Sequence, residues 1–325
     1  MKITVVVPVV LAGVIVLAVA AHSGGEQAQL RMAYFANVGH AIPIVGVERG
    51  FFEDVGVIET RIFDSGPQVI ESMFAGSIDV AYVGPGPAIN GFLNSANKNV
   101  QILAGAASGG ASFVAHPDSD VYGISDFDGK RIAAPQIGNT QDVSLRDALS
   151  AHGLVPAERG GSVIIHNIPN PDIYTLFVKG EIDGAWVPEP WATILEQDLG
   201  GKRLFHEEEL WPDGEFASVL LIANTDYVQK NPEIISELLR SHNYTASWIN
   251  QNPAESRNSF NDFLNSYLGR PLPDRIVDVA LANTEITADP KADSVYSFAT
   301  KADKLGYLGR HGYDLSGIFY GDDVQ

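Results

Sequence analysis

The chain of 325 residues contains no cysteine, and this absence excludes several kinds of chemistry. The protein can form neither a disulfide bond nor a thiolate nucleophile, and it cannot bind zinc or an iron–sulfur cluster through cysteine. Attachment of a lipid through a cysteine side chain is excluded as well. Any function must therefore rest on other side chains or on the backbone.

Basic residues are scarce. Lysine and arginine together number 21 against 40 aspartates and glutamates, so the formal net charge at pH 7 is −19. Nucleic-acid-binding proteins present clustered basic residues to the phosphate backbone, and this chain has no basic run. We therefore expect no nucleic-acid partner.

Common catalytic and metal-binding motifs are also missing. No G-x-S-x-G, H-E-x-x-H, phosphate-binding P-loop or G-x-G-x-x-G pattern follows a predicted strand. The eight histidines are scattered, without the i, i+4 pair that zinc sites on helices use. We therefore predict no catalytic residue, no metal ligand and no cofactor. The acidic segment 206–209 is expected to be a solvent-exposed turn.

The first 25 residues differ from the rest, because no charged residue occurs in Ile3–Ala21. One interpretation is a cleaved secretory signal peptide, with the small residues Ala18–Ala20 at the cleavage site. The other is a retained membrane anchor, because this run approaches the roughly 20 residues that span a bilayer. Either interpretation places the rest of the chain outside the cytoplasm, in the periplasm or on the outer face of the membrane.

The body of the chain alternates short apolar segments with helical ones up to about residue 223, which is typical of an α/β fold. After Asn231, three pairs of a capping residue and proline (231–232, 252–253 and 289–290) predict a helical C-terminal extension without further strands. The expected strands are Leu30–Phe35, Thr60–Phe63, Ile78–Val83, Ile102–Ala106, Arg131–Ala134, Val163–His166, Ile182–Val187 and Ser218–Ala223.

Two stretches of the chain repeat one pattern. Residues 67–83 (PQVIESMFAGSIDVAYV) align without a gap with residues 171–187 (PDIYTLFVKGEIDGAWV). Each reads as a helix, a glycine stop and a strand that ends in a proline-rich turn. A weaker repeat pairs Leu30–His40 with Arg131–Gln141. These repeats predict two lobes of like construction.

Turns that follow the predicted strands are the candidate ligand site. In open α/β sheets, ligands bind beyond the carboxyl ends of the strands, where helix N-termini present unpaired N–H groups. Such turns from two lobes could hold an oxyanion without a buried cation, although each could equally be an ordinary capping turn. Their residues are Asn37, Gly39, His40, Gly84, Pro85, Gly86, Gly138, Asn139, Thr140 and Gln141.

Four further residues join this candidate site. Trp186 and Trp191 are either core residues or aromatic walls of a cleft, with Tyr82 at the position equivalent to Trp186. Glu189 between them could face a ligand ammonium group or be a solvated charge. Ser65 could cap its helix, contact the ligand, or do both. Because the acidic body repels anions at long range, a zwitterion with its amine at Glu189 is expected to bind better than a simple anion.

Three motifs together resemble a known family. The segments Gly46–Phe52 (GVERGFF), Gly76–Ala81 (GSIDVA) and Gly180–Trp191 (GEIDGAWVPEPW) are similar to those of substrate-binding components of ABC importers in the aliphatic sulfonate, taurine and nitrate group. The resemblance covers about residues 29–250. The chain departs from the family because it lacks the cysteine that often follows the leader and carries a lipid.

This resemblance implies a two-lobed fold of the periplasmic-binding-protein type II kind with a helical C-terminal extension. Lobe 1 would comprise residues 29–115 and 217–325, and lobe 2 residues 116–216, with chain crossings near Phe113–His116 and Gly214–Ser218. A small anion or zwitterion would bind between the lobes, and the partners would be an ABC permease and ATPase, with the membrane as a further partner if the leader is retained.

Two other classes share this fold by resemblance. An extracellular sensing domain would use the same cleft, but would need a partner for its output. A branch that makes the thiamine pyrimidine works inside the cell and carries a cysteine-rich motif. This chain has a leader-like segment and no cysteine, which favours the importer component over that enzyme.

Overall fold

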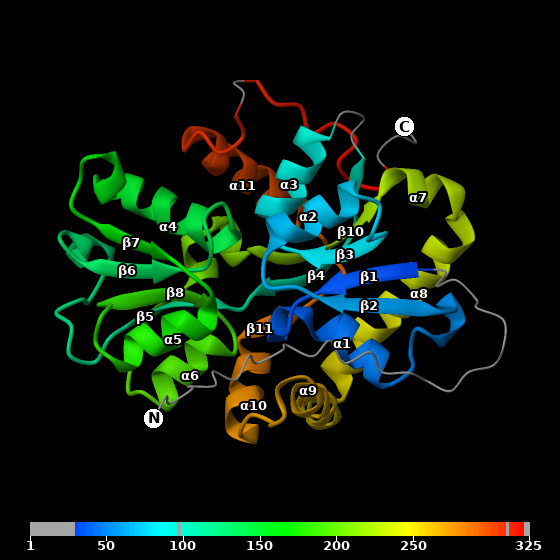
Figure 1. The fold of residues 1–325 in the computed structure, drawn as a ribbon, viewed down its shortest axis with the longest axis horizontal. Helices are drawn as coiled ribbons and strands as arrows, with labels where there is room; N and C mark the ends of the chain where they lie inside the picture. Colours follow the sequence, from blue (N-terminus) through cyan, green and yellow to red (C-terminus); the bar gives the residue numbers. More distant parts are fainter. Residues whose placement is uncertain (1–29, 96–98, 310–311, 322–325) are drawn as a thin grey trace, which may run out of the picture.

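The computed structural model describes residues 30–95, 99–309 and 312–321, which form two α/β lobes, each built on one sheet (Figure 1). The interpretations of residues 1–25 as signal peptide or anchor lie outside these residues. Among the described helices, none has both the length and the apolar character required to cross a membrane.

The sheet of lobe 1 has six strands in the order β11-β4-β10-β3-β1-β2. Strand β1 pairs in parallel with β2 and β3, whereas β10 runs antiparallel to β3 and β4, and β11 antiparallel to β4. The strands are β1 (Leu30–Tyr34), β2 (Ile58–Ile62), β3 (Val80–Val83), β4 (Val100–Gly109), β10 (Ala217–Asn224) and β11 (Thr284–Ile286).

Burial along the strands follows their place in this sheet. Central β3 is buried at every position, because helices cover both of its faces. Edge strand β2 carries Glu59, Thr60 and Arg61, all exposed, between two half-buried isoleucines. Charged residues on an edge strand discourage pairing with another chain.

The sheet of lobe 2 has five strands in the order β7-β6-β8-β5-β9. Strand β6 pairs in parallel with β7 and β8, and β5 pairs antiparallel with β8 and β9. The strands are β5 (Ala111–Ala115), β6 (Arg131–Ala134), β7 (Ile164–Asn167), β8 (Gly184–Pro188) and β9 (Lys202–His206).

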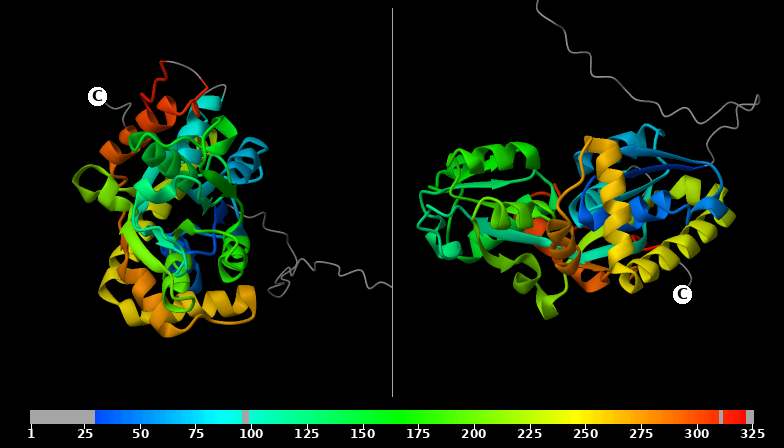
Figure 2. Two further views of the ribbon diagram at one scale, coloured as in Figure 1. Left: turned by 90° about the vertical axis from the view of Figure 1, so that its left-hand side faces the viewer. Right: turned by 90° about the horizontal axis from the view of Figure 1, so that it is seen from below.

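Helices cover both sheets. In lobe 1 one face packs against α1, α8, α9 and α10, and the other against α2, α3 and α11; in lobe 2 the two faces carry α4 and the pair α5 and α6. Figure 2 shows the lobes side by side, with the C-terminal helices on lobe 1. The helices are α1 (Ala41–Glu48), α2 (Gly66–Phe74), α3 (Pro85–Asn94), α4 (Thr140–Ala151), α5 (Asn170–Val178), α6 (Trp191–Gln197), α7 (Thr225–Lys230), α8 (Pro232–Gln251), α9 (Pro253–Leu268), α10 (Asp274–Ala282) and α11 (Ala292–Lys304).

The repeated sequence pattern corresponds to a repeated structure. In each copy, an aspartate between helix and strand binds an arginine at the start of the neighbouring strand. Asp79 Oδ2 accepts from the backbone N–H and Nε of Arg31, and Asp183 Oδ2 does the same for Arg131. Because Arg31 and Arg131 are equivalent, the weaker repeat proposed from Leu30 and Arg131 is misaligned by one residue.

Two crossings join the lobes. The first lies at Gly109 and Gly110, between β4 and β5, and not near Phe113–His116, because β5 already belongs to the second sheet. Both glycines have left-handed φ angles, 68° and 74°, which other residues adopt with difficulty. The second crossing is the segment 207–216 between β9 and β10.

The mixed α/β fold with a helical C-terminal part is confirmed, with three corrections. Strand β9 was missed, β5 was expected only as a strand that crosses between the lobes, and the C-terminal part contains the short strand β11. The pair Asp289 and Pro290 does not start a helix directly. Helix α11 starts at Ala292, after Lys291, because Lys291 adopts a left-handed φ of 49°.

Candidate functional site

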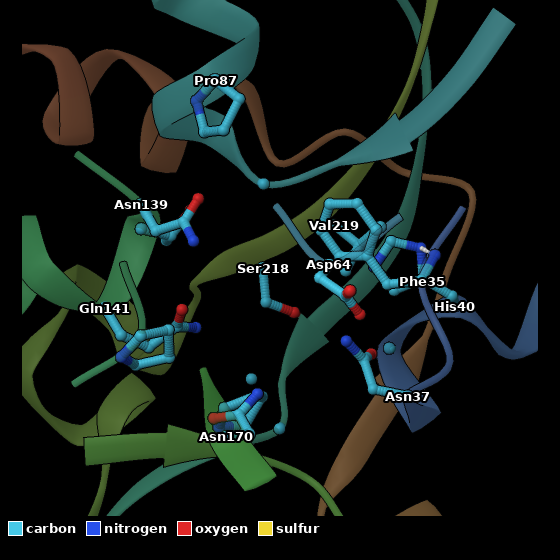
Figure 3. Close-up of a pocket in the computed structure, with 17 residues that line it drawn as sticks. Phe35, Asn37, His40, Asp64, Pro87, Asn139, Gln141, Asn170, Ser218 and Val219 are labelled. Carbon is cyan, nitrogen blue, oxygen red and sulfur yellow. Dashed lines mark hydrogen bonds between the residues drawn. The ribbon is translucent and has the colours of Figure 1, made fainter. Parts of the chain in front are cut away.

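A cavity of about 80 Å³ lies between the lobes and is lined by residues of both. Figure 3 shows Asn139 and Gln141 on one side of it, with Asn37, His40 and Asp64 on the opposite side. Sites for drug-sized ligands enclose roughly 300–1,000 Å³. The cavity is therefore suited to a small molecule.

The lobes contact each other beside this cavity. A Cβ atom built on Gly84 would lie 2.1 Å from Thr140 Oγ1, and one on Gly86 would lie 3.3 Å from the carbonyl oxygen of Gly138. Gly84 and Gly86 belong to lobe 1, whereas Gly138 and Thr140 belong to lobe 2. The structure therefore shows a closed arrangement, and a side chain at position 84 would have to displace Thr140.

Helix α4 begins at the cavity. Its N-cap residue Asn139 makes no side-chain cap bond, and its amide faces the cavity (Figure 3). The N–H groups of Thr140 and Gln141 lie in the first turn and have no acceptor within the helix. These groups and the helix dipole favour an anionic or electron-rich group of a ligand.

The turn before α4 is held by a buried carboxylate. Gly138 has a left-handed φ of 76°, and its N–H donates to Asp142 Oδ2 at 3.0 Å. Asp142 is fully buried, and Arg146 Nε donates to its Oδ1 at 2.8 Å. Arg146 therefore balances a negative charge that would otherwise oppose an anion at the α4 N-terminus.

The start of α3 offers fewer donors than expected. Pro85 and Pro87 occupy the first and third helical positions and have no N–H group. Gly86 keeps its N–H, but neither Gly86 nor Pro85 lines the cavity. The oxyanion-binding role expected for residues 84–86 therefore falls mainly to α4.

His40 contributes a neutral ring to the cavity wall. Its side chain is buried, which lowers its pKa to about 3. Nδ1 accepts a hydrogen bond from the backbone N–H of Phe35 at 3.2 Å. The ring proton is therefore on Nε2, and His40 is a hydrogen-bond donor rather than a cation at neutral pH.

Two polar oxygens in the cavity wall are buried without a partner among the described residues, Ser218 Oγ and Asn170 Oδ1. Ser218 lies on β10 of lobe 1, and Asn170 is the first residue of α5 in lobe 2. An unpaired buried polar group costs free energy. These two atoms therefore mark positions where a ligand or a water would complete hydrogen bonds.

Asp64 is the acidic residue of the cavity lining, and it is exposed. No lysine or arginine occurs among the described residues of this lining. A simple anion would therefore be held by neutral donors, whereas a ligand with an ammonium group would also find a carboxylate at Asp64.

The tryptophans expected as cavity walls lie elsewhere. Trp186 on β8 is fully buried inside lobe 2, and its Nε1–H donates to Glu207 Oε2 at 2.8 Å. Trp191 on α6 packs against Tyr174 and does not line the cavity. Tyr82 is also fully buried, with its hydroxyl 2.9 Å from His242 Nδ1. Trp186 and Tyr82 belong to the lobe interiors, and Trp191 is half-buried outside the cavity, which corrects the expectation of aromatic walls.

Glu189 is withdrawn from the cavity by its own partners. Its Oε1 accepts from Arg203 Nη1 and from Asn283 Nδ2, both at 2.8 Å. Its Oε2 accepts from the backbone N–H of Thr193 at 3.0 Å, and the side chain is only 1% exposed. The position of Glu189 therefore corrects the expectation that it faces a ligand ammonium group.

The acidic segment 206–209 is likewise not a simple exposed turn. Glu207 is fully buried against Trp186, and this burial raises the pKa of its carboxyl group to about 7. Its Oε1 has no hydrogen-bond partner among the described residues. Glu207 therefore belongs to the lobe 2 interior at the second crossing, whereas Glu209 is exposed.

The structure brings together about half of the predicted site residues. Those that line the cavity are Asn37, Gly39, His40, Gly84, Asn139, Thr140 and Gln141. Those that do not are Ser65, Pro85, Gly86, Gly138, Trp186, Glu189 and Trp191. Lining residues that the sequence analysis missed are Phe35, Asp64, Pro87, Gly109, Gly110, Pro135, Asn170, Pro188, Ser218 and Val219.

Some of the missed residues had a signal in the sequence. Asn170 immediately precedes the second repeat, at the position equivalent to Gly66. Asp64 immediately precedes Ser65, which is the buried N-cap residue of α2.

Metal binding has no support in the described part of the chain, where no cluster of three histidines or carboxylates is placed to hold an ion.

Two α/β lobes with a small polar cavity between them are the architecture of two-lobed solute-binding proteins. The alkanesulfonate-binding protein SsuA of Xanthomonas axonopodis pv. citri, bound to MOPS, superposes with a TM-score of 0.72 at 20% identity, covering 88% of this chain and 95% of SsuA. The nitrate-binding protein NrtA of Synechocystis PCC 6803 gives 0.71 at 18% identity, covering 87% and 83%. These likenesses confirm the periplasmic-binding-protein type II fold.

The chain belongs to the NMT1-like family, whose model matches residues 23–261. A binding protein of Brucella abortus is 28% identical over 230 residues, which cover 70% of this chain and 69% of the relative. The taurine-binding periplasmic protein of Escherichia coli is 29% identical over 189 residues, covering 58% of this chain and 56% of that protein. Aliphatic sulfonate binding is ascribed to a Bacillus subtilis relative, 22% identical over 275 residues, covering 80% and 78%.

Proposed function

We propose that the protein is the extracytoplasmic substrate-binding component of an ABC importer for a small organic or inorganic anion of the sulfonate, taurine or nitrate class. The observation that carries this proposal is the cavity between the lobes, where the α4 N-terminus meets neutral donors and two unpaired buried oxygens. The taurine- and sulfonate-binding relatives support the ligand class. The role is binding, without catalysis.

Ligand capture would proceed by closure of the lobes. The two lobes would move as units. The sequence analysis expected residues 29–115 and 217–325 in lobe 1 and residues 116–216 in lobe 2. We reassign β5 to lobe 2 because it pairs in that sheet. Gly109, Gly110 and the segment 207–216 would act as the hinge. An ABC permease and its ATPase would then recognise the closed, loaded form.

An amino-bearing anion fits the cavity better than a simple anion. Its acid group would accept hydrogen bonds from the first turn of α4, from His40 Nε2–H and from neighbouring amides. Its ammonium group would lie near Asp64, which takes the role first considered for Glu189. This arrangement removes the conflict between an anionic ligand and a chain of net charge −19.

We further propose that the leader places the protein outside the cytoplasm, either as a cleaved signal or as an anchor. Protease should digest the protein in cells whose outer membrane, where present, has been made permeable while the cytoplasmic membrane stays intact. Digestion only after the cytoplasmic membrane is broken would contradict this localisation.

A thermal-shift screen of taurine, ethanesulfonate, nitrate and related small molecules tests the binding function. A ligand at a hundred times its Kd stabilises the folded state by about 2.7 kcal/mol. At least one compound of this class should raise the melting temperature, and calorimetry should then give one site per chain. No stabilisation by any of them at millimolar concentration would contradict the proposed class.

A further inference from the structure

We propose that the described residues following α11, 305–309 and 312–321, act as a latch that holds the lobes closed, with Tyr307 as a positioning residue for the cavity turn at α4. The inference rests on the proposed function in one respect, because the latch would set how long a ligand stays bound. Its structural part stands on contacts that do not involve a ligand.

Tyr307 joins the C-terminal segment to lobe 2. Its hydroxyl donates to Asp142 Oδ2 at 2.7 Å, and the same oxygen accepts the Gly138 N–H at 3.0 Å. Burial and the Asp142 carboxylate both raise the pKa of Tyr307, so the hydroxyl keeps its proton and remains a donor. One carboxylate oxygen therefore links Tyr307 directly to the turn that precedes Asn139.

The other oxygen of Asp142 is fixed within lobe 2. Oδ1 accepts from Arg146 Nε at 2.8 Å and from Asn167 Nδ2 at 2.9 Å. The Asn167 amide also donates to the carbonyl oxygen of Pro135, a cavity-lining residue. Asp142 is fully buried, so the loss of its Tyr307 donor would not be replaced easily by water.

Three further contacts bring α11 and the segment after it against lobe 2. Lys301 on α11 forms an ion pair with Asp147 on α4. Arg159 of lobe 2 donates through Nη2 to the carbonyl oxygen of Leu305 at 3.0 Å. Val143 of α4 is buried in a hydrophobic cluster that otherwise belongs to lobe 1 and the second crossing. Asp142, Val143 and Asp147 thus meet α11 or the segment after it within the first two to three turns of α4, the helix whose Thr140 and Gln141 line the cavity.

The latch is anchored in lobe 1 at its far end. Leu308, Leu315 and Phe319 are buried in the lobe 1 cluster. The backbone N–H of Ile102 on β4 donates to Ile318 O at 2.7 Å, and the N–H of Tyr320 donates back to Ile102 O at 2.8 Å. Because the segment is attached to lobe 1, Tyr307 must leave Asp142 when the lobes separate.

The geometry therefore makes opening of the cleft depend on a buried hydrogen bond outside the ligand site. While Tyr307 is in place, the Gly138 turn and the α4 N-terminus keep the arrangement that lines the cavity. When it leaves, Asp142 loses one donor, and the turn loses part of its support. The latch would thus slow ligand release without contacting the ligand.

Tyr307→Phe removes the hydroxyl and keeps the ring. In the ligand-free protein, hydrogen–deuterium exchange in peptides covering residues 136–145 should become about tenfold faster, the effect of losing one hydrogen bond to a charged group. With taurine as the probe, the dissociation rate should rise about tenfold while the association rate stays within about twofold. Tyr313→Phe is the matched control, because the Tyr313 hydroxyl bonds Thr300 within the C-terminal part.

Unchanged exchange in residues 136–145 of Tyr307→Phe, with an intact fold, would overturn the latch. The same holds if Tyr313→Phe has an equal effect. If exchange rises but the wild type binds no taurine, the latch stands and the choice of ligand fails. If Tyr307→Phe does not fold, Lys301→Met, which removes the ion pair with Asp147, must accelerate exchange in α4; otherwise the proposal is rejected.

Discussion

Glu189 and Arg203 form a buried ion pair, with 2.8 Å between Glu189 Oε1 and Arg203 Nη1. Arg203 Nη1 also donates to Ser112 Oγ at 2.7 Å, and Asn283 of the C-terminal part donates to the same Glu189 oxygen. This network joins β9, β5 and the segment before α6 to a residue beyond α10. Its role is therefore structural, at the junction of the lobes.

Glu189→Gln should consequently destabilise the fold without changing ligand preference. Breaking a buried ion pair leaves an uncompensated charge and typically costs about 3–5 kcal/mol. Chemical denaturation measures the loss. Glu196→Gln is the matched control, because Glu196 pairs with the same arginine but is partly exposed, and it should cost less than about 1 kcal/mol. If the Glu189→Gln protein is fully stable but binds amino-bearing and amine-free anions equally well, Glu189 belongs to the ligand site.

Asp64→Asn should weaken the preference for an amino-bearing anion. We expect taurine to bind the wild type about two- to fivefold better than ethanesulfonate, since an exposed carboxylate contributes modestly. The variant should bind the two ligands equally in calorimetry at one ionic strength. Glu71→Gln, an exposed change on the neighbouring helix α2, should leave the preference intact. If the wild type binds ethanesulfonate as well as taurine, Asp64 has no ammonium-binding role.

Thr140→Ala should weaken ligand binding by about 1–3 kcal/mol, because the hydroxyl lies at the cavity in the first turn of α4. Thr175→Ala on α5 removes an exposed hydroxyl that bonds only Pro171 O, and it should leave binding unchanged. Calorimetry compares the two. If Thr140→Ala binds the ligand as tightly as the wild type, the turn at Thr140 is an ordinary capping turn.

Gly138→Val should also weaken binding, through backbone strain rather than through a steric clash. No atom lies within 4 Å of a Cβ built on Gly138, so the substitution does not block the backbone. Its cost comes from the left-handed φ of 76°, about 1–2 kcal/mol for a residue with a side chain. That strain would disturb the turn that Asp142 holds.

The repeats and strand patterns predicted the two-lobed fold because they depend on local sequence. Asp79 and Asp183 occupy equivalent places, and their arginine partners confirm the duplication at atomic detail. The turns that follow β1 and β6 line the cavity as predicted. Here the sequence signal was local: a strand, a turn with Gly or Asn, and a helix.

Features that depend on distant contacts could not be predicted. Trp186 lies within β8, but its place in the interior depends on Glu207 from the second crossing. The proline-rich turn around Glu189 predicts an exposed side chain, yet Arg203 and Asn283 donate hydrogen bonds to its carboxylate in the interior. Tyr307 binds Asp142 across 165 residues of sequence, and nothing in its neighbourhood distinguishes it from a surface tyrosine.

Glu207 predicts a specific dependence of stability on pH. Burial raises the pKa of its carboxyl group from 4.5 to about 7, so the folded state binds more protons than the unfolded state between these values. The contribution of Glu207 to the free energy of unfolding is fully present below pH 4.5 and is lost as the pH rises through 7. The difference between the pKa values of the unfolded and folded states corresponds to roughly 3 kcal/mol of stability, at about 1.4 kcal/mol per pH unit.

Glu207→Gln, which resembles the protonated carboxyl group, should therefore be more stable than the wild type at pH 8 by about 2–3 kcal/mol. The difference should vanish near pH 4.5. Urea denaturation across this range measures it, with Glu181→Gln as an exposed control. A difference that does not change with pH would show that Glu207 titrates normally.

The central claim is that a small ligand binds where the lobes close, and Gly84→Val tests it most directly. The backbone of Gly84 is extended, with φ −72° and ψ 168°, so valine should not disturb lobe 1 itself. Its Cβ would lie 2.1 Å from Thr140 Oγ1, so Thr140 would have to shift and closure is disfavoured. Gly123→Val, at a position where no atom lies within 4 Å of the added Cβ, is the control. Calorimetric titration with taurine should show one site in the wild type and in Gly123→Val, and at least about tenfold weaker binding in Gly84→Val with an intact fold. Wild-type affinity in Gly84→Val would contradict binding by closure.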